Sequence, residues 1–177
     1  MFLENEKIKL RAVEPEDLDI LYRWENNPSY WHAGELRTPY SKFALKQYIL
    51  SAGQNIYENK QLRFMIELKT QNKTVGTIDL FDFDAFNSRV GVGLLIDKPY
   101  RENGLAEESL KLVEEFVFSY LKINQLYAHV AETNETSGKL FERCGFEKTC
   151  MLKDWISAEN GFSDVILFQL FREKIIK

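Results

Sequence analysis

The sequence predicts a mixed α/β fold built on a mostly antiparallel sheet of about seven strands. The chain has 177 residues, 45% of them hydrophobic, so it can form one domain with a full core. Three strand patterns between residues 63 and 96 are joined by short turns, which makes them antiparallel neighbours. A long amphipathic helix joins the third of them to the next strand, and such a crossover requires a parallel pair.

Local patterns predict each element in turn. In chain order we expect a strand at residues 7–13, helices at 15–26 and from 41, strands at 63–69, 74–84 and 89–96, a helix from 104 to about 120, a strand at 126–131, a helix at 135–143, and strands at 146–155 and 162–171. Residues 29–40 are aromatic but lack a regular period, so we expect an irregular segment there.

The helices are placed by their ends. Glu14-Pro15-Glu16-Asp17 opens the first helix, because Pro and acidic residues suit a first helical turn. Ser41 and Asn134 can cap two later helices, and Gly145 stops the last one. Each boundary therefore rests on a residue type with a known preference.

The strands are placed by alternation and by turns. Ile8, Leu10 and Ala12 share one face of the first strand. Gln71-Asn72-Lys73 and Asn87-Ser88 separate the central strands, and Asn160-Gly161 is a strong hairpin signal. The sequence therefore indicates a single domain spanning residues 1–177.

The composition argues against several classes of protein. The net charge is −4 and no basic run occurs, which disfavours general binding to nucleic acid. Cys144 and Cys150 lack the partners of a zinc site, so we expect no metal. The first residues are charged where a signal peptide needs an apolar run, and no apolar stretch approaches the ~20 residues of a membrane span. We therefore expect a cytoplasmic protein that binds no membrane.

The turn after residue 96 carries the most informative pattern, Arg-x-x-Gly-x-Ala at residues 101–106. A tight turn before a helix exposes successive backbone N–H groups, and the helix dipole favours an anion there. The dinucleotide and nucleoside-triphosphate glycine patterns are both missing. The turn therefore predicts a site for a pyrophosphate-bearing ligand, although a Gly at this place also fits a tight turn alone.

A second pattern follows at residues 134–146, where an Asn precedes a short helix that leads into Gly145-Phe146. Together with the element order, the two patterns resemble the GNAT superfamily of acyl-CoA-dependent N-acyltransferases. Residues 10–18, 25–27 and 75–80 resemble its spermidine/diamine N-acetyltransferase branch, and the ribosomal-protein N-terminal acetyltransferases share much of this. The resemblance implies helices on both faces of the sheet and fourth and fifth strands that splay apart.

The resemblance also implies acetyl-CoA as co-substrate and a set of residues that bind it. The pantetheine arm would lie along the fourth strand, and the pyrophosphate would lie on the turn. Gly91 and Gly93 fit a bulge or a close backbone approach, or simply a strand that makes room for a helix. Asn134 either bonds the pantetheine or only caps its helix. The expected cofactor-binding residues are Leu94, Leu95, Ile96, Arg101, Glu102, Asn103, Gly104, Leu105, Ala106, Asn134, Ser137 and Phe141.

Catalysis needs a neutral amine and an acceptor for its proton. Asp79 is the candidate base, since it lies in an apolar strand where burial would favour proton uptake, although an edge or solvent-facing acid without a catalytic role also fits this position. Two positions depart from the family pattern. Phe141 stands where many members carry a Tyr that protonates the thiolate, and Gly91 stands where many carry a Glu. Water, Ser137 or Cys144 could replace the acid, and the sequence does not choose among them.

The acceptor is expected to be an amine. Acidic and aromatic residues near the first helix could bind a cationic amine through charge and cation–π contacts, although each also fits ordinary packing. These residues are Glu25, Asn26, Tyr30, Trp31 and Glu35. We therefore expect an N-acetyltransferase for a polyamine or diamine. Acetylation of protein N-termini and a non-catalytic acyl-CoA-binding module are the alternatives, and a homo-oligomer is compatible with each.

Overall fold

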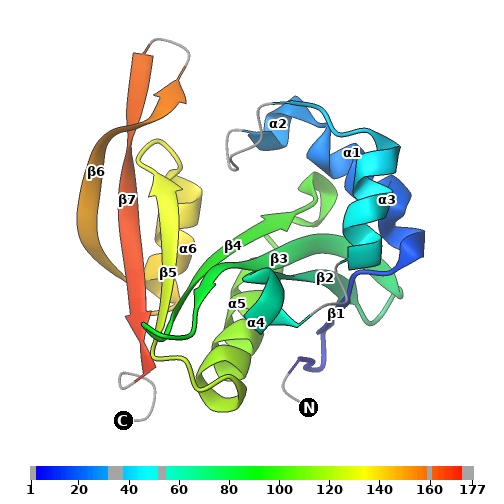
Figure 1. Cartoon of the computed structure of the whole chain (residues 1–177), viewed down its shortest axis with the longest axis horizontal. Helices are drawn as coiled ribbons and strands as arrows, with labels where there is room; N and C mark the ends of the chain where they lie inside the picture. Colours follow the sequence, from blue (N-terminus) through cyan, green and yellow to red (C-terminus); the bar gives the residue numbers. More distant parts are fainter. Residues whose placement is uncertain (1–2, 32–37, 52–54, 159–160, 173–177) are drawn as a thin grey trace.

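A seven-stranded sheet organises the chain (Figure 1), and the computed structural model describes residues 3–31, 38–51, 55–158 and 161–172. The order across the sheet is β1-β2-β3-β4-β5-β7-β6. Only β4 and β5 run parallel; the other neighbouring pairs are antiparallel. The strands are β1 (Ile8–Ala12), β2 (Leu62–Leu68), β3 (Lys73–Asp84), β4 (Arg89–Ile96), β5 (Gln125–Ala131), β6 (Glu147–Ala158) and β7 (Gly161–Phe171).

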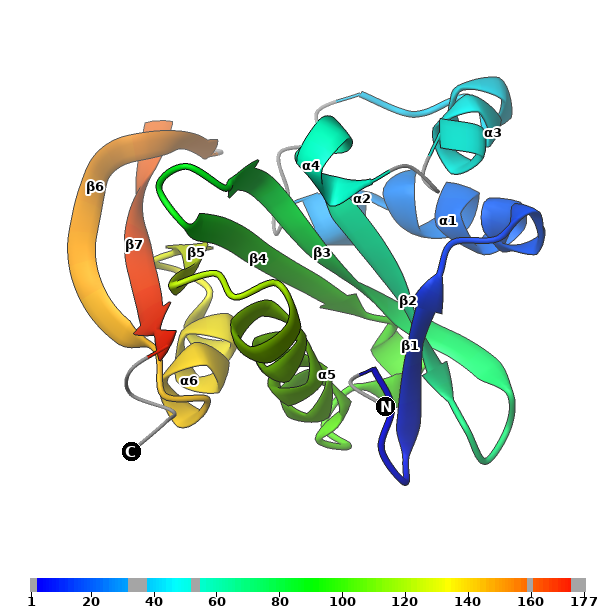
Figure 2. The same cartoon turned by 60° about the horizontal axis from the view of Figure 1, so that its bottom comes forward.

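Helices cover both faces of this sheet (Figure 2), with α1 and α3 on one face and α5 and α6 on the other. The helix α5 continues into a π-helical turn over Phe116–Tyr120. Short 3-10 turns precede α1 and α5, at Pro15–Asp17 and Lys98–Tyr100. The helices are α1 (Leu18–Glu25), α2 (Pro28–Trp31), α3 (Lys42–Ser51), α4 (Ile56–Asn59), α5 (Leu105–Glu115) and α6 (Glu135–Arg143).

The alternation of side chains along the strands divides the core into two apolar clusters. On β2, Phe64 and Ile66 belong to the larger cluster, which also contains the buried side chains of α5 and α6. Met65 between them points the other way and packs with Leu21 and Trp24 of α1. Burial on both faces therefore fixes the register of the central strands.

The predicted order of the main elements is confirmed, including the parallel crossover and the final hairpin. Two short helices were not expected. Residues 28–31 form α2 rather than an irregular segment, because Pro28 occupies the first helical position, where its missing N–H costs nothing. The helix α4 begins where the Asn55 side chain accepts the Tyr57 N–H at 3.0 Å.

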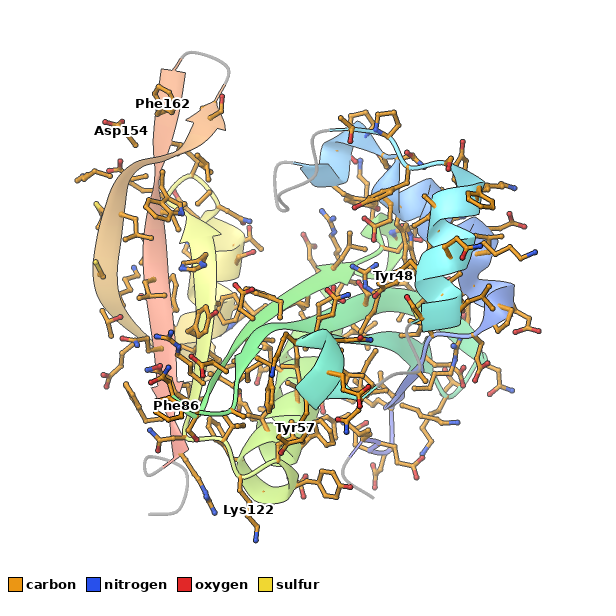
Figure 3. The ribbon with its side chains drawn as sticks, in the orientation of Figure 1. Tyr48, Tyr57, Phe86, Lys122, Asp154 and Phe162 are labelled. Atoms are coloured by element: carbon orange, nitrogen blue, oxygen red, sulfur yellow. The ribbon has the colours of Figure 1, made fainter. Side chains whose placement is uncertain are left out.

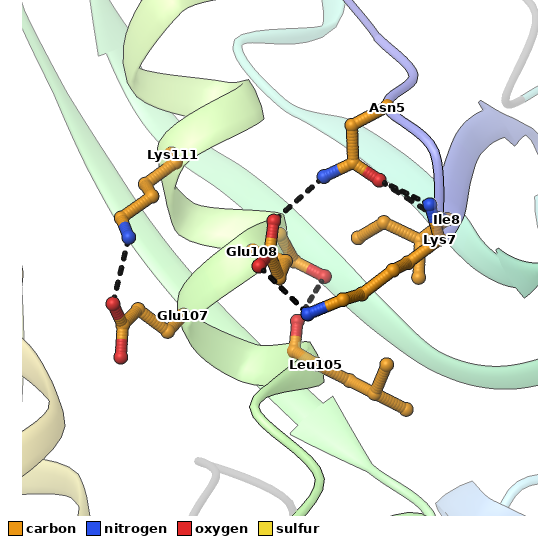
Figure 4. A network of polar contacts seen from close by, with 8 residues as sticks. Asn5, Lys7, Ile8, Leu105, Glu107, Glu108 and Lys111 are labelled. Carbon is orange, nitrogen blue, oxygen red and sulfur yellow. Dashed lines mark hydrogen bonds and ion pairs between the residues drawn. The ribbon is translucent and has the colours of Figure 1, made fainter.

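A polar network ties the N-terminal segment to the first turns of α5 (Figure 4). The Asn5 side chain donates to Glu108 Oε2 at 2.7 Å, and Lys7 Nζ lies 3.3 Å from Glu108 Oε1. Asn5 Oδ1 also accepts the N–H groups of Lys7 and Ile8. The start of α5 is thereby held against β1, and this fixes the turn that precedes the helix.

Glu114 is a half-buried residue of α5. Its Oε1 atom is buried and has no hydrogen-bond partner among the described residues. Burial raises the pKa of Glu114 from 4.5 to about 7, although Lys111 opposes this shift. The nearby Cys144 thiol is affected as well: burial and then the charge of Glu114 raise its pKa to about 11.

Replacing Glu114 by Gln is expected to stabilise the protein at high pH. A raised pKa in the folded state means that folding favours the protonated carboxyl, so wild-type stability falls as pH rises from about 4.5 to about 7. Urea unfolding should show a gain of about 2 kcal/mol for E114Q at pH 8, and little gain near pH 4.5. The exposed neighbour Glu115 provides the control E115Q, and an E114Q gain that is independent of pH would contradict this account.

Candidate active site

The sheet opens between its two parallel strands. Pairing of β4 with β5 is limited to three residue pairs and ends at Gly91 and Tyr127. Beyond that point, β4 pairs only with β3, and β5 pairs only with β7. The facing edges of β4 and β5 can therefore offer backbone hydrogen bonds to an extended ligand, as an added strand would receive them. The predicted splay of the fourth and fifth strands is confirmed.

The two glycines of β4 differ in the space available for a side chain. A Cβ at Gly91 would lie 2.3 Å from the Phe81 ring, whereas a Cβ at Gly93 would have an ordinary contact at 3.6 Å. The register of β4 against β3 runs without a shift from Gly91 to Ile96 and shifts between Phe81 and Asp84 of β3, so the irregularity lies beside Gly91 and not at Gly93. Gly91 makes room for an aromatic side chain of the neighbouring strand rather than for a helix.

The turn before α5 presents a row of unbonded amides. Gly104 adopts φ +75° and Glu102 adopts φ +63°. The backbone N–H groups from Glu102 to Glu107 donate no hydrogen bond to any described residue. The Arg101 amide, expected among the donors, instead bonds to the Lys98 carbonyl. The exposed N–H groups that the sequence predicted are present at the start of an eleven-residue helix, where they suit an anion, and the binding of a pyrophosphate there remains a prediction.

The side chains around this turn connect it to α2. The Arg101 Nε donates to the Ile96 carbonyl at 2.9 Å, and its guanidinium lies 5.3 Å from the centroid of the Tyr30 ring. The Tyr30 hydroxyl donates to Asp97 Oδ1 at 2.9 Å, and Asp97 also caps the Lys98 N–H. Tyr30, expected near the acceptor, therefore has its hydroxyl at the base of the turn.

On the other side of the opening, α6 begins at Asn134. The Asn134 side chain accepts the Ser137 N–H at 3.2 Å, so the capping interpretation is confirmed. Phe141 is buried in the main core, with ring centroids 5.0 Å from Phe146 and 5.9 Å from Phe168. The contacts of these residues with a cofactor remain predictions.

Asp79 lies in an ion-pair network on the face of the sheet that α1 and α3 cover. The Arg63 guanidinium donates to both carboxylate oxygens of Asp79, with the longer bond 3.2 Å, and through Nη1 to Glu25 Oε1. The side chains of Arg63, Glu25 and Asp79 are 19%, 15% and 27% exposed. Asp79 is therefore ion-paired and partly exposed, whereas the sequence predicted only its place in an apolar strand.

Arg63 is the member of this network that the sequence did not indicate. It lies directly opposite Asp79 in the β2–β3 register, and its Cζ atom lies 5.5 Å from the centroid of the Tyr48 ring. Figure 3 shows Tyr48 between α3 and the sheet. Burial lowers the pKa of Arg63, but the charges of Asp79, Tyr48 and Glu25 and the hydrogen bond to Asp79 together outweigh it and raise the pKa overall. Arg63 is therefore a permanent cation.

The remaining predicted acceptor residues are less informative. Asn26 exchanges hydrogen bonds with the backbone N–H and carbonyl of Tyr40, so it links the end of α1 to the segment that precedes α3. Trp31 ends α2, but its side chain and the whole of Glu35 lie outside the described residues. The exposed His129 ring lies edge-on to Tyr127, with centroids 5.5 Å apart.

Two further properties concern ions and membranes. No group of three or more His, Cys, Asp or Glu side chains is close enough to hold a metal ion within the described ranges. None of the helices in the described part of the chain has the length and apolar character that a membrane span requires.

The splayed parallel strands, the open amide turn and the carboxylates beside them define an acyl-CoA-dependent N-acyltransferase. The family model described as acetyltransferase (GNAT) domain matches residues 7–147. The chain therefore belongs to the GNAT family of acetyltransferases, whose co-substrate is acetyl-CoA, and the expected resemblance is confirmed.

Known relatives cover nearly the whole chain. An uncharacterised N-acetyltransferase from the SPbeta prophage of Bacillus subtilis (strain 168) is 29% identical over 169 residues, 96% of this chain and 92% of the relative. The spermidine N(1)-acetyltransferase of Vibrio cholerae serotype O1 is 24% identical over 175 residues, 97% of each chain.

Solved structures show the same fold. The Vibrio cholerae spermidine N-acetyltransferase in complex with CoA and spermine has a TM-score of 0.87 at 23% identity, covering 98% of this chain and 100% of that chain. A dodecameric structure of the same enzyme in an intermediate state has a TM-score of 0.82 at 24% identity, covering 98% of each chain.

Replacing Gly104 by Ala is expected to weaken CoA binding about tenfold. An added Cβ would meet nothing within 4 Å, but Ala rarely adopts φ +75°, and this conformation costs roughly 1–2 kcal/mol. The turn would relax and move its amides away from the phosphate. Isothermal titration with CoA measures the effect, and E102G, which relieves a similar φ, is the matched control. Equal CoA affinity of G104A and the wild type would show that the turn does not bind the phosphate.

Proposed function

We propose that this protein transfers the acetyl group of acetyl-CoA to a primary amine of a diamine or polyamine. The observation that carries the proposal is the opening between β4 and β5, together with Asp79 of β3 and Glu25 of α1 on the sheet face that α1 and α3 cover. An extended acyl-CoA site is thereby combined with negative charge that attracts a cationic amine. The full-length similarity to spermidine acetyltransferases supports this choice of acceptor.

The co-substrate would be bound mainly by backbone groups. The amides from Glu102 to Glu107 would receive the pyrophosphate, and the open edge of β4 from Leu94 to Ile96 would pair with the pantetheine arm. Arg101 would add positive charge near the phosphates. Ser137 and Phe141 on α6 would contact the arm from the other side.

The chemistry would be direct attack on the thioester. The neutral amine forms the C–N bond as the C–S bond breaks, and backbone N–H groups of β4 polarise the carbonyl. Asp79 takes the amine proton directly or through one water. The CoA thiolate is protonated from water, because Phe141 has no proton to give. Glu25, Asn26, Tyr30, Trp31 and Glu35 complete the proposed acceptor site.

The wider organisation belongs to the same proposal. We propose that residues 1–177 act as one acetyltransferase domain in the cytoplasm, without nucleic acid, membrane or metal as partners. Association into a homo-oligomer is proposed from the dodecameric form of the Vibrio cholerae relative. Light scattering of the purified protein tests the last point.

The function is tested by a panel of acceptors. Purified protein with acetyl-CoA should release CoA in the presence of spermidine, spermine or putrescine, at rates well above those with peptides that carry a free N-terminus. Release of the CoA thiol measures the rate, and mass spectrometry identifies the acetylated amine. A preference for peptides would favour protein N-terminal acetylation, and CoA binding without turnover of any amine would favour the non-catalytic module.

Replacing Asp79 by Asn is expected to lower kcat about 100-fold, which is the lower range for loss of a general base. Asn keeps the size and a hydrogen bond to Arg63 but cannot take up a proton. CoA affinity, measured by isothermal titration, should stay within about twofold. The control is D154N, which changes an exposed Asp at the outer end of the β6–β7 hairpin (Figure 3). An unchanged kcat in D79N would remove Asp79 from the mechanism.

A further inference from the structure

The Glu25–Arg63–Asp79 network lies where the acceptor amine would meet the thioester. Arg63 is opposite Asp79 on β3, and Asp79 is opposite Gly93 on β4. Gly93 is two residues beyond Gly91, the last β4 residue that pairs with β5. Arg63, Asp79 and Gly93 therefore lie in one line across β2, β3 and β4. This line ends at the edge of β4 that faces the opening.

The network carries an unequal charge. Glu25 and Asp79 contribute two negative charges and Arg63 one positive charge, so the sum is −2 + 1 = −1. Arg63 binds both oxygens of Asp79 and one oxygen of Glu25, and an ammonium group that approaches these carboxylates has to compete with the guanidinium.

Stability gives a weak reason for such an arrangement. Charged groups that are mostly buried lose hydration, and replacing a buried ion pair with apolar residues often leaves a protein equally stable. The three side chains are between 15% and 27% exposed, so most of that cost applies here. Stability alone therefore does not explain a guanidinium at this position, whereas a role in the reaction would explain it.

We propose that Arg63 sets the pH at which the acceptor amine loses its proton, by fixing the net charge of the Glu25–Arg63–Asp79 network. Only the neutral amine is a nucleophile. Two carboxylates alone would hold the ammonium form, whereas a guanidinium beside them disfavours it. Arg63 is thus a positioning residue that acts through charge, and this inference rests on the proposed function.

Two tyrosines near the network have a raised pKa. Burial raises the pKa of Tyr48 above its ordinary value, and Tyr40 lies within the range of its charge. Burial, and then the charge of Asp82, raise the pKa of Tyr127, which lies on β5 on the same side of the sheet. His129 shares that side through its ring contact with Tyr127, so the variant H129Q serves as a control for this residue.

A series of variants changes the charge stepwise. E25Q makes the sum 0, R63Q makes it −2, and both the double variant E25Q/R63Q and the conservative R63K keep it at −1. The pH dependence of kcat is measured from pH 6 to 10 with acetyl-CoA and spermidine, because kcat reports ionisations in the bound complex.

The expected result follows the charge. The rising limb of the kcat–pH profile should move to lower pH by about 0.5–1 unit in E25Q and to higher pH by a similar amount in R63Q. This size is expected for one charge at short range in a partly hydrated site. The double variant and R63K should lie within about 0.3 pH unit of the wild type. Recovery in the double variant is not expected if the guanidinium acts only by packing.

The opposing results are distinct. A limb that stays in place throughout the series, or a double variant that behaves like R63Q, overturns the role of Arg63 while leaving acetyl transfer intact. If R63Q does not fold, the E25Q profile decides, because it must still move down. A wild type that acetylates no amine removes the proposed function itself, and this inference falls with it.

Discussion

The parallel pairing of β4 and β5 ends after three residue pairs, and the rest of the site depends on that early end. Backbone groups within a sheet normally find partners on both sides, and an open edge is a place where another extended chain can bind. Here the opening lies inside the sheet rather than at its border. A ligand bound in this opening would therefore contact the turn before α5 at one end and the α1 and α3 face of the sheet at the other.

Two sets of polar contacts fix the position of the turn before α5. Asn5 and Lys7 hold Glu108, which fixes the first turns of α5 against β1. Tyr30 holds Asp97 at the entrance of the amide turn. The turn is thus fixed by groups on both faces of the sheet, and α2 contacts the same loop whose amides are free. Binding of phosphate at the turn and of an amine near α2 would act on one connected piece of structure.

Local order in the sequence was enough to predict the framework. Alternation, caps and one crossover helix predicted the order of the main elements, and the pattern at residues 101–106 predicted the turn with open amides before α5. The Arg63–Asp79 pair could not be predicted in the same way, because it depends on which residues of β2 and β3 stand opposite each other. That register is set by burial on both faces, which a single strand pattern does not reveal.

The two departures from the family pattern have a common explanation in packing. Phe141 lies between the rings of Phe146 and Phe168 in the main core, where a hydroxyl would need a partner that the apolar surroundings do not supply. Gly91 leaves the space that the Phe81 ring occupies, and a larger side chain would collide with that ring.

Neither position can therefore carry an ionisable group without repacking its neighbours. The groups that can handle a proton near the opening lie on the α1 and α3 face of the sheet. There two carboxylates share one guanidinium, and in the proposed reaction their balance of charge, rather than a single dedicated acid, would govern the protonation state of the amine.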